Sequence, residues 1–262
     1  MDARPRGFYE RTQHYLKESG LSVEGKRVLV GGAGTLGSRI VRNLARFNFE
    51  EIYVIDFDEV GVENVGYQCF HTDEVGLNKA TTLTSRLQQF HPWTKLIGIE
   101  LEVPTPSGLW SDKSFGYVNE LVKKVDIVVT SFDVLAPRAV LLALAVKHNK
   151  KFVNVGIGSY RGYVKVLKEG YCPICERIWD EKVRYYTDPN LAEVVAAISV
   201  QAVLFLLNGK EWPSEIHVNV NAPYSMISAN DVTNEGCPLC SDEVKKLESS
   251  REFLKYLIEK TY

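Results

Sequence analysis

Apolar residues form short, nearly continuous runs along the first part of the chain, and these runs predict buried strands. They cover residues 28–30, 52–55, 96–101, 126–130 and 152–155. Stretches with helical spacing separate them. A strand that is apolar on both faces must be covered on both faces, so the pattern predicts a parallel sheet between two layers of helices.

The predicted helices alternate with these strands. They cover residues 7–19, 38–47, 78–90, a short helix ending at 121–124, and 135–148. Residues 58–72 are expected to be irregular, and residues 104–116 to form a turn-rich surface loop. Alternating strands and helices indicate an α/β, Rossmann-like, doubly wound and mostly parallel sheet.

The pattern changes after residue 155. Residues 159–167 and 215–227 read as antiparallel strands, and residues 242–260 as a final amphipathic helix. The apolar run 191–207 is shorter than the roughly 20 residues of a membrane span, so we expect a buried helix and no membrane association. We predict one domain over residues 1–262. Its first half is 1–157, and 158–262 is an antiparallel extension.

Composition and charge are those of a globular protein. The chain has 262 residues, of which 45% are apolar and 24% charged, with a formal net charge of -2. Nucleic acid is therefore an unlikely partner, because sequence-independent binding usually needs a basic field. The first seven residues lack the apolar core of a secretory signal, and a cytoplasmic location is expected.

A glycine-rich turn follows the first strand. Gly32, Gly34 and Gly37 fit the spacing in which one glycine makes a tight turn, the next admits a phosphate and the third lets helix and strand pack closely. Asp56 ends the next strand, where a carboxylate can bind a ribose. These residues predict a nucleotide site, and a merely structural turn is the alternative.

Four of the five cysteines fall into two CxxC pairs, namely Cys172 with Cys175 and Cys237 with Cys240. Each pair can occupy two corners of a tetrahedron, so together they predict a closed, structural Zn²⁺ site. A redox CxxC is the alternative. The fifth, Cys69, reads as a core or loop residue.

Residues 56–79 carry a more specific pattern. Asp56, Asp58, Val60, Asn64 and Gln68 precede Gly76 and Lys79. The chain here resembles the ubiquitin-activating adenylyltransferases of the ThiF/MoeB type, whose pattern runs D-x-D-x-V-x-x-x-N-x-x-R-Q and then G-x-x-K-A. The likeness spans nearly the whole chain. It includes Tyr9-Glu10-Arg11, Ser131-Phe132-Asp133 with Arg138, and the apolar helix between the cysteine pairs.

The resemblance implies an enzyme that uses ATP and Mg²⁺ to adenylate the C-terminal carboxylate of a ubiquitin-fold or sulfur-carrier protein. It implies that residues 1–157 are the nucleotide-binding half and that residues 158–262 carry the zinc knuckles and a partner-docking surface. It implies that Arg11, Lys79 and Asp133 are catalytic, that Asp133 binds magnesium, and that Arg11 acts across a homodimer interface. The residues expected to bind the nucleotide are Gly32, Gly34, Gly37, Asp56, Asp58, Asn64, Gln68 and Lys79.

Simpler interpretations exist for several of these residues. The alternative for Lys79 is a solvated helix start, for Asp133 a helix cap and for Arg11 a surface charge. Arg138 reads better as an anchor that pairs with a carboxylate than as a catalytic group.

The chain departs from the family pattern at several points, among them Val134 in place of an asparagine and Thr130 in place of an acid. Tyr67 stands where the family has an arginine, so the cation expected at the γ-phosphate is missing unless Arg11, Arg39 or Arg42 replaces it. Residues 176–190 contain no cysteine, so we expect adenylation without an enzyme thioester.

Three alternative functions follow. The first is a catalytically weak or inactive scaffold that binds nucleotide and docks a ubiquitin-fold protein, which Tyr67 favours. The second is an NAD-dependent oxidoreductase, which residues 32–56 alone permit. The third is a transfer-RNA dehydratase of the same family, which the mild acidity of the chain disfavours.

Overall fold

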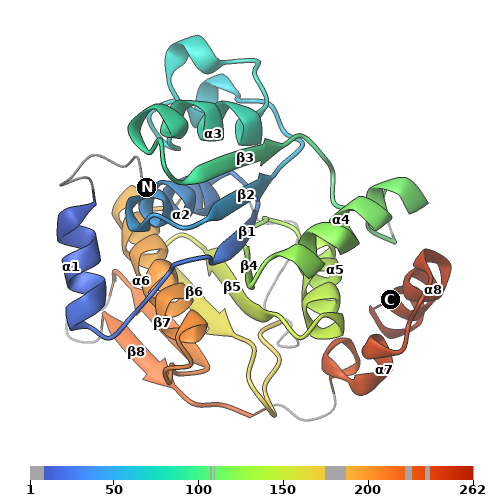
Figure 1. The fold of residues 1–262 in the computed structure, drawn as a ribbon. Coiled ribbons are helices and arrows are strands. Elements are labelled where there is room, and N and C mark those ends of the chain that lie inside the picture. The colour runs from blue at the N-terminus through green and yellow to red at the C-terminus, as the bar shows by residue number, and fades with distance from the viewer. Residues whose placement is uncertain are drawn as a thin grey trace, which may run out of the picture.

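A computed structural model describes residues 9–106, 108, 110–174, 187–221, 226–233 and 237–261. Its centre is a single sheet of eight strands with the order β3-β2-β1-β4-β5-β6-β7-β8 (Figure 1). The strands are β1 Arg27–Gly31, β2 Glu51–Ile55, β3 Lys95–Ile99, β4 Ile127–Thr130, β5 Lys151–Ile157, β6 Arg161–Val166, β7 Glu215–Asn219 and β8 Ile227–Asn230.

The sheet is parallel from β3 to β5 and antiparallel from β5 to β8. The prediction of a mixed α/β fold with a mostly parallel sheet and an antiparallel extension is confirmed. β5 joins the two parts, because it pairs with parallel β4 on one side and antiparallel β6 on the other. Only residues 158–160 connect β5 to β6, and Gly158 N–H closes this turn on Arg161 O at 2.7 Å.

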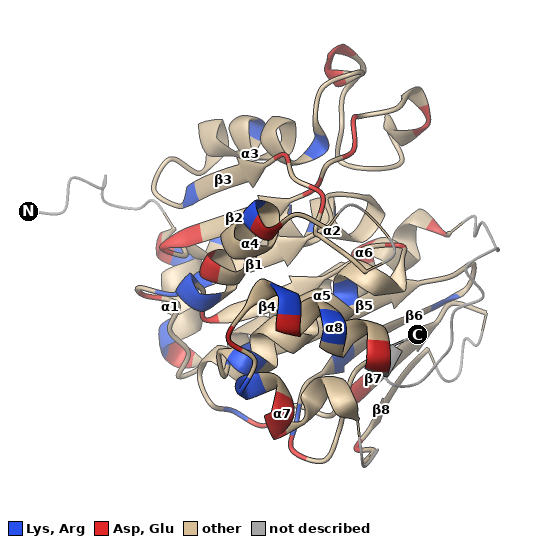
Figure 2. Ribbon diagram, turned by 90° about the vertical axis from the view of Figure 1, so that its right-hand side faces the viewer, with Lys and Arg blue, Asp and Glu red and all other residues tan. Residues whose placement is uncertain are grey.

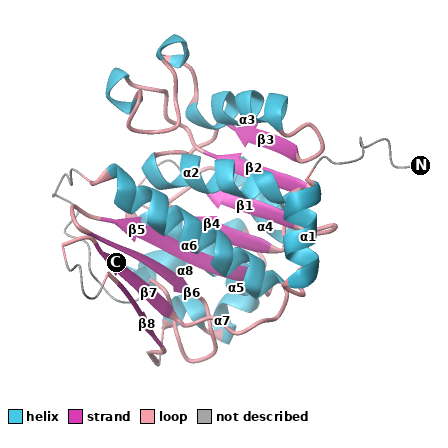
Figure 3. Cartoon of the chain, turned by 90° about the vertical axis from the view of Figure 1, so that its left-hand side faces the viewer, coloured by secondary structure: helices cyan, strands magenta, loops and turns pink. Residues whose placement is uncertain are grey.

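Helices cover both faces of the sheet (Figure 3). One face carries α1 Glu10–Glu18, α2 Thr35–Leu44, α3 Lys79–Phe90 and α6 Pro189–Leu207. The other carries α4 Asp112–Lys124, α5 Leu135–Lys147, α7 Asp242–Lys245 and α8 Ser250–Thr261. The predicted doubly wound arrangement follows from the strands. Val28 and Val30 pack into the first core and Leu29 into the second, so β1 needs a helical layer on each side.

Helix α6 begins two residues before the predicted run, and it is long and apolar enough to cross a membrane by length and composition alone, contrary to the expectation from the length of that run. Within the described structure it packs against α2, β5 and β6, and ten of its residues are buried. Asp188 caps its start by accepting hydrogen bonds from Asn190 N–H and Leu191 N–H. The prediction of a buried helix in this stretch is confirmed.

Three sequence predictions of element boundaries are wrong. The predicted helix 242–260 is divided into α7 and α8, because Ser249 and Glu252 form a reciprocal cap that starts a new helix. The predicted strand 215–227 is two strands, β7 and β8, which pair antiparallel. The predicted loop 104–116 ends earlier, since the Ser111 side chain caps α4 by accepting from Ser114 N–H.

The crossover between β2 and α3 projects beyond the sheet (Figures 1 and 3). It contains the 3-10 turns Val62–Asn64 and Thr72–Glu74, so it is more regular than the sequence suggested. Its loops carry many acidic residues (Figure 2). We refer to residues 56–78 as the crossover segment.

Candidate functional site

The carboxyl ends of three adjacent strands meet at one edge of the sheet. In the sheet register Gly31 of β1 lies opposite Ile55 of β2 and Thr130 of β4. The chain leaves β1 towards β2 and later returns on the other side through β4, which makes β1 and β4 the topological switch point. Ligands of open α/β sheets bind in the crevice at such a point.

The glycine turn after β1 has the predicted geometry. Gly32 has φ +92°, which an L side chain rarely adopts. A Cβ on Gly37 would lie 1.8 Å from Gly32 O, so only glycine lets α2 approach the turn this closely. Gly34 is the N-cap residue of α2. Backbone N–H groups at a helix start such as this one can bind a phosphate.

Asp56 is fixed beside this turn. Its Oδ2 accepts a hydrogen bond from Ala33 N–H at 2.6 Å, and its Oδ1 accepts one from Asp58 N–H at 2.9 Å. Burial raises the pKa of Asp56, while these two hydrogen bonds act in the opposite direction. Each oxygen keeps a lone pair with which to accept a ribose hydroxyl.

Lys79 begins α3 next to the same strand end. Its Nζ pairs with Asp58 Oδ2 at 3.0 Å, and the lysine side chain is only 10% exposed. Asn78 caps α3 and also donates to the carbonyl oxygens of Asp56 and Asp58. The interpretation of Lys79 as a solvated helix start is therefore wrong in one respect, because the side chain is buried against Asp58.

Gln68 lies next to the glycine turn. Its Nε2 is 4.0 Å from the position that a Cβ on Gly34 would take. Within the described residues its Oε1 is buried and has no hydrogen-bond partner. A partly buried amide whose buried oxygen is unused suits a site that a ligand completes. Asn64 instead uses its Oδ1 to accept from Gly61 N–H inside the crossover segment.

Two arginines close to the crossover segment share one carboxylate. Arg39 Nε lies 2.8 Å from Glu193 Oε1, and Arg42 Nη2 lies 2.6 Å from Glu193 Oε2. Arg39 also donates to Thr35 O and Tyr67 O. Sequence reasoning missed Glu193 as a partner of these cations, although an acid within an apolar helix was the available signal.

Asp133 follows β4, and its side chain is exposed in the described structure. The preceding loop is held against the glycine turn, since Ser131 Oγ donates to Gly31 O at 3.0 Å. Arg138 is buried and donates to Phe132 O, Val155 O and Asn154 Oδ1. It anchors α5 to the sheet as expected, and it also donates to Tyr163 Oη.

Arg11 is exposed on α1, away from this edge. Tyr9 precedes α1 and contacts Ala45 O and His91, which lie just after α2 and α3 and so next to the amino ends of the strands. Within one chain the structure does not bring Arg11 to the glycine turn.

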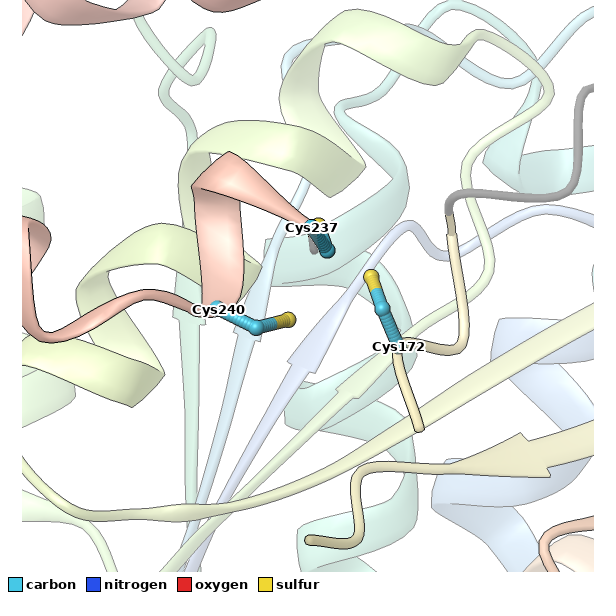
Figure 4. Close-up of side chains that lie close together, drawn as sticks. All are labelled: Cys172, Cys237 and Cys240. Atoms are coloured by element: carbon cyan, nitrogen blue, oxygen red, sulfur yellow. The ribbon is translucent and has the colours of Figure 1, made fainter. Parts of the chain in front are cut away.

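Three of the four predicted zinc ligands come together (Figure 4). The sulfur atoms of Cys172, Cys237 and Cys240 all lie within 4.8 Å of one another. Sulfur atoms around a tetrahedral zinc are about 3.8 Å apart, so three thiolates of this kind fit the ion. Cys175 lies outside the described residues. Cys69 is not part of the cluster and packs against the core beneath α2.

Comparisons with known proteins agree with this geometry. The sequence model of the ThiF family matches residues 12–238. The SUMO-activating enzyme subunit uba-2 of Caenorhabditis elegans is 31% identical over 165 residues, which is 63% of this chain and 27% of that protein. The ubiquitin-like modifier-activating enzyme ATG7 of Saccharomyces cerevisiae is 24% identical over an alignment of 275 positions, which covers 90% of this chain and 43% of that protein. The chain thus spans less than half the length of these curated relatives.

Solved structures share the fold. E. coli MccB with ATP superposes with a TM-score of 0.73 at 19% identity, over 90% of this chain and 75% of that chain. PaaA gives a TM-score of 0.68 at 14% identity, over 87% of this chain and 85% of that chain.

Proposed function

The chain belongs to the ThiF family, and on that premise we propose that it adenylates the C-terminal carboxylate of a ubiquitin-fold or sulfur-carrier protein. Two relatives are named for activating SUMO or a ubiquitin-like modifier, and MccB has been solved with ATP and with MccA. These names support ATP as the nucleotide and a protein or peptide as the second substrate.

The proposed reaction needs no protein nucleophile. A carboxylate oxygen of the partner attacks the α-phosphorus of ATP, and the bond from that phosphorus to the bridging oxygen breaks. Pyrophosphate leaves with the bonding electrons, and the partner becomes an acyl adenylate. Residues 176–190 contain no cysteine, which supports the absence of a later thioester on this stretch.

The observation that carries the proposal is the contact between Asp56 and Ala33. It holds a carboxylate for the ribose against the turn that would hold the phosphates, at the switch point of the sheet. Gln68 and Asn64 are proposed to contact the triphosphate, and Lys79 to offset the charge that develops on it. Lys79 must first exchange its bond to Asp58 for one to phosphate.

Two metals belong to the proposal. A magnesium ion would draw electron density from the phosphate oxygens when bound, and Asp133 is the carboxylate proposed to hold it. Zinc is proposed to be held by Cys172, Cys237 and Cys240, with Cys175 as the fourth ligand. Two CxxC pairs that bind a metal suit a reducing compartment, so we keep the cytoplasm as the proposed location.

The proposal includes a homodimer. Arg11 is exposed on α1, near the amino edge of the sheet, and could act at a nucleotide only across an interface with a second copy. The dimer is therefore tied to the proposed role of Arg11.

A second candidate is a nucleotide-binding scaffold with little turnover. Tyr67 replaces the arginine of the family pattern, and Arg39 is held by Glu193, Thr35 and Tyr67. Arg39 would have to give up these bonds to serve as the missing cation.

Pyrophosphate exchange separates the two candidates. The full chain with ATP, magnesium and a purified carrier should return labelled pyrophosphate to ATP if it adenylates, whereas a scaffold binds ATP in a thermal-shift assay without exchange. Lys79→Ala should reduce exchange by about 100-fold, while Lys95→Ala, a surface lysine on β3, should not. Stabilisation by NAD and not by ATP would contradict both candidates. A mass gain of one AMP on the carrier would identify the partner.

A further inference from the structure

A buried chain of polar side chains joins the cysteine cluster to the loop that carries Asp133. It begins at Pro173, the residue after Cys172, whose carbonyl oxygen accepts a hydrogen bond from Asn154 Nδ2 at 2.9 Å. Asn154 lies in the middle of β5 and is 3% exposed. The first cysteine knuckle is thus bonded directly to a strand of the parallel sheet.

The other end of the same amide faces the loop after β4. Asn154 Oδ1 accepts from Arg138 Nη1 at 2.7 Å and from Thr130 Oγ1 at 3.1 Å. Arg138 then donates to Phe132 O from Nε at 2.7 Å. Because the amide uses its donor towards the knuckle and its acceptor towards Arg138, one side chain links both regions.

The loop that receives these bonds lies on the glycine turn. A Cβ on Gly31 would lie 2.6 Å from the Phe132 ring, and one on Gly32 would lie 3.2 Å from Phe132 N. Ser131 Oγ donates to Gly31 O and Gly32 O. A shift of Phe132 would therefore press on the turn or withdraw from it, because no free space separates them.

Helix α5 provides a second contact between the cysteine cluster and the loop that carries Asp133. Helix α5, which begins at Leu135 and carries Arg138, packs against Pro238–Cys240 of the second knuckle. The first knuckle is thus bonded to β5 and the second packs against α5, and these two elements carry the side chains that hold residues 131–133.

We propose that Asn154 and Arg138 are positioning residues that couple metal occupancy of the cysteine cluster to the conformation of residues 131–133, and through them to nucleotide binding. The link to the nucleotide rests on the proposed function. The link from metal to loop does not need the nucleotide, since it is argued from the cysteine cluster and these hydrogen bonds. By thermodynamic reciprocity, a nucleotide that orders the loop must also strengthen metal binding.

Hydrogen exchange of the full chain tests the coupling. Zinc-loaded protein is compared with protein stripped by a chelator, and amide exchange is followed in peptides covering residues 130–136. We expect stripping to raise exchange at residues 131–133 by about tenfold or more, while α3 changes little. Equal exchange in the two forms, or a zinc-loaded preparation that retains no zinc, would overturn the proposal.

Variants of Asn154 separate coupling from simple stability. Asn154→Asp keeps the acceptor for Arg138 and removes the donor to Pro173, so the loop should stay protected but lose its response to zinc. Asn154→Leu removes both and should raise exchange whether or not zinc is present. Gln88→Leu is the matched control, because Gln88 is an amide with three hydrogen bonds at the end of α3, and its zinc response should equal that of the wild type. The proposal is wrong if Asn154→Asp responds to zinc as the wild type does.

Nucleotide binding provides the second readout. The dissociation constant of ATP should rise on zinc removal in the wild type and not in Asn154→Asp, and ATP should slow zinc transfer to a chromogenic chelator. Should ATP bind neither form, the proposed function fails, and the exchange experiment still decides the coupling of metal to loop.

Discussion

The hydroxyl of Tyr67 donates a hydrogen bond to the carbonyl oxygen of Thr187, 2.7 Å away and 120 positions later in the chain. The carbonyl of Tyr67 accepts from Arg39 Nη2 at 2.9 Å. Thr187 stands just before the N-cap of α6, so Tyr67 ties the crossover segment to α2 and to the start of α6. The departure from the family pattern at this position therefore has a structural use.

Substitutions of Tyr67 test whether this position, an arginine in the family pattern, faces the phosphates. Tyr67→Phe loses one partly buried hydrogen bond and should lower the free energy of unfolding by about 1 kcal/mol. Tyr67→Arg loses the same bond and adds a cation beside Gln68, so it should bind ATP about tenfold more tightly than Tyr67→Phe. Calorimetric titration measures the ATP affinity of the two variants. Equal ATP affinity in the two variants would show that this position does not face the phosphates.

Glu193 should be needed for stability. Glu193→Gln removes the charge shared by Arg39 and Arg42, and Arg39 is only 6% exposed, so a buried guanidinium loses its counter-charge. Because Glu193 itself is 44% exposed, water offsets part of the loss, and we expect about 1–2 kcal/mol. Urea unfolding checks this. Glu259→Gln, which breaks an exposed pair with Lys255, is the control and should change little.

The cysteine cluster should hold one zinc per chain. Elemental analysis should find the metal in the wild type and in Cys69→Ser, whose thiol lies outside the cluster, and should not find it in Cys237→Ser. Loss of the metal should lower the melting temperature by roughly 10 °C, since the ion ties distant segments together. Retention of zinc by Cys237→Ser would contradict the ligand assignment.

Acid should destabilise the antiparallel extension through Glu215. Burial alone would raise the pKa of this carboxyl, but hydrogen bonds from His217, Tyr171 and Lys165 lower it to about 2. A folded pKa below the unfolded value of 4.5 gives stability that is complete above 4.5 and lost as the pH falls towards 2. Glu215→Gln should flatten this decline, by on the order of 2 kcal/mol.

Denaturation across this pH range measures the effect. Glu211→Gln, an exposed acid between α6 and β7, is the control and should retain the decline of the wild type. A decline in Glu215→Gln as steep as that of the wild type would assign the acid sensitivity to other groups.

The sequence predicts the parallel sheet and its glycine turn because their signals are local. An apolar run such as 28–30 needs burial on both faces, and the spacing of Gly32 and Gly37 marks a helix that passes within contact of the turn. The cysteine pairs are equally legible, and three of the four thiols meet as predicted. The signals for these features, a run of apolar residues, a glycine spacing or a CxxC pair, each lie within a few residues, although the two cysteine pairs meet across more than 60 positions.

Features that depend on distant partners could not be predicted. The pairs Tyr67 with Thr187 and Arg39 with Glu193 join positions more than 100 residues apart, and no periodicity marks them. Ser249 divided a helix that hydropathy alone continues, because a reciprocal cap outweighed the apolar spacing. The predicted roles of Lys79, Asp133 and Arg11 remain predictions, which pyrophosphate exchange can test.

The shared strand β5 limits how such a chain can be enlarged. An insertion between β5 and β6 would have to open the three-residue turn at 158–160. It would disrupt the pairing of β5 with β6, which joins the parallel and antiparallel parts of the sheet. The crossover segment lies outside the eight-stranded sheet, between the end of β2 and the start of α3, so it can lengthen without disturbing the pairing of the eight strands. Diversification of this scaffold should therefore accumulate between β2 and α3, and the β5–β6 hairpin should keep its length.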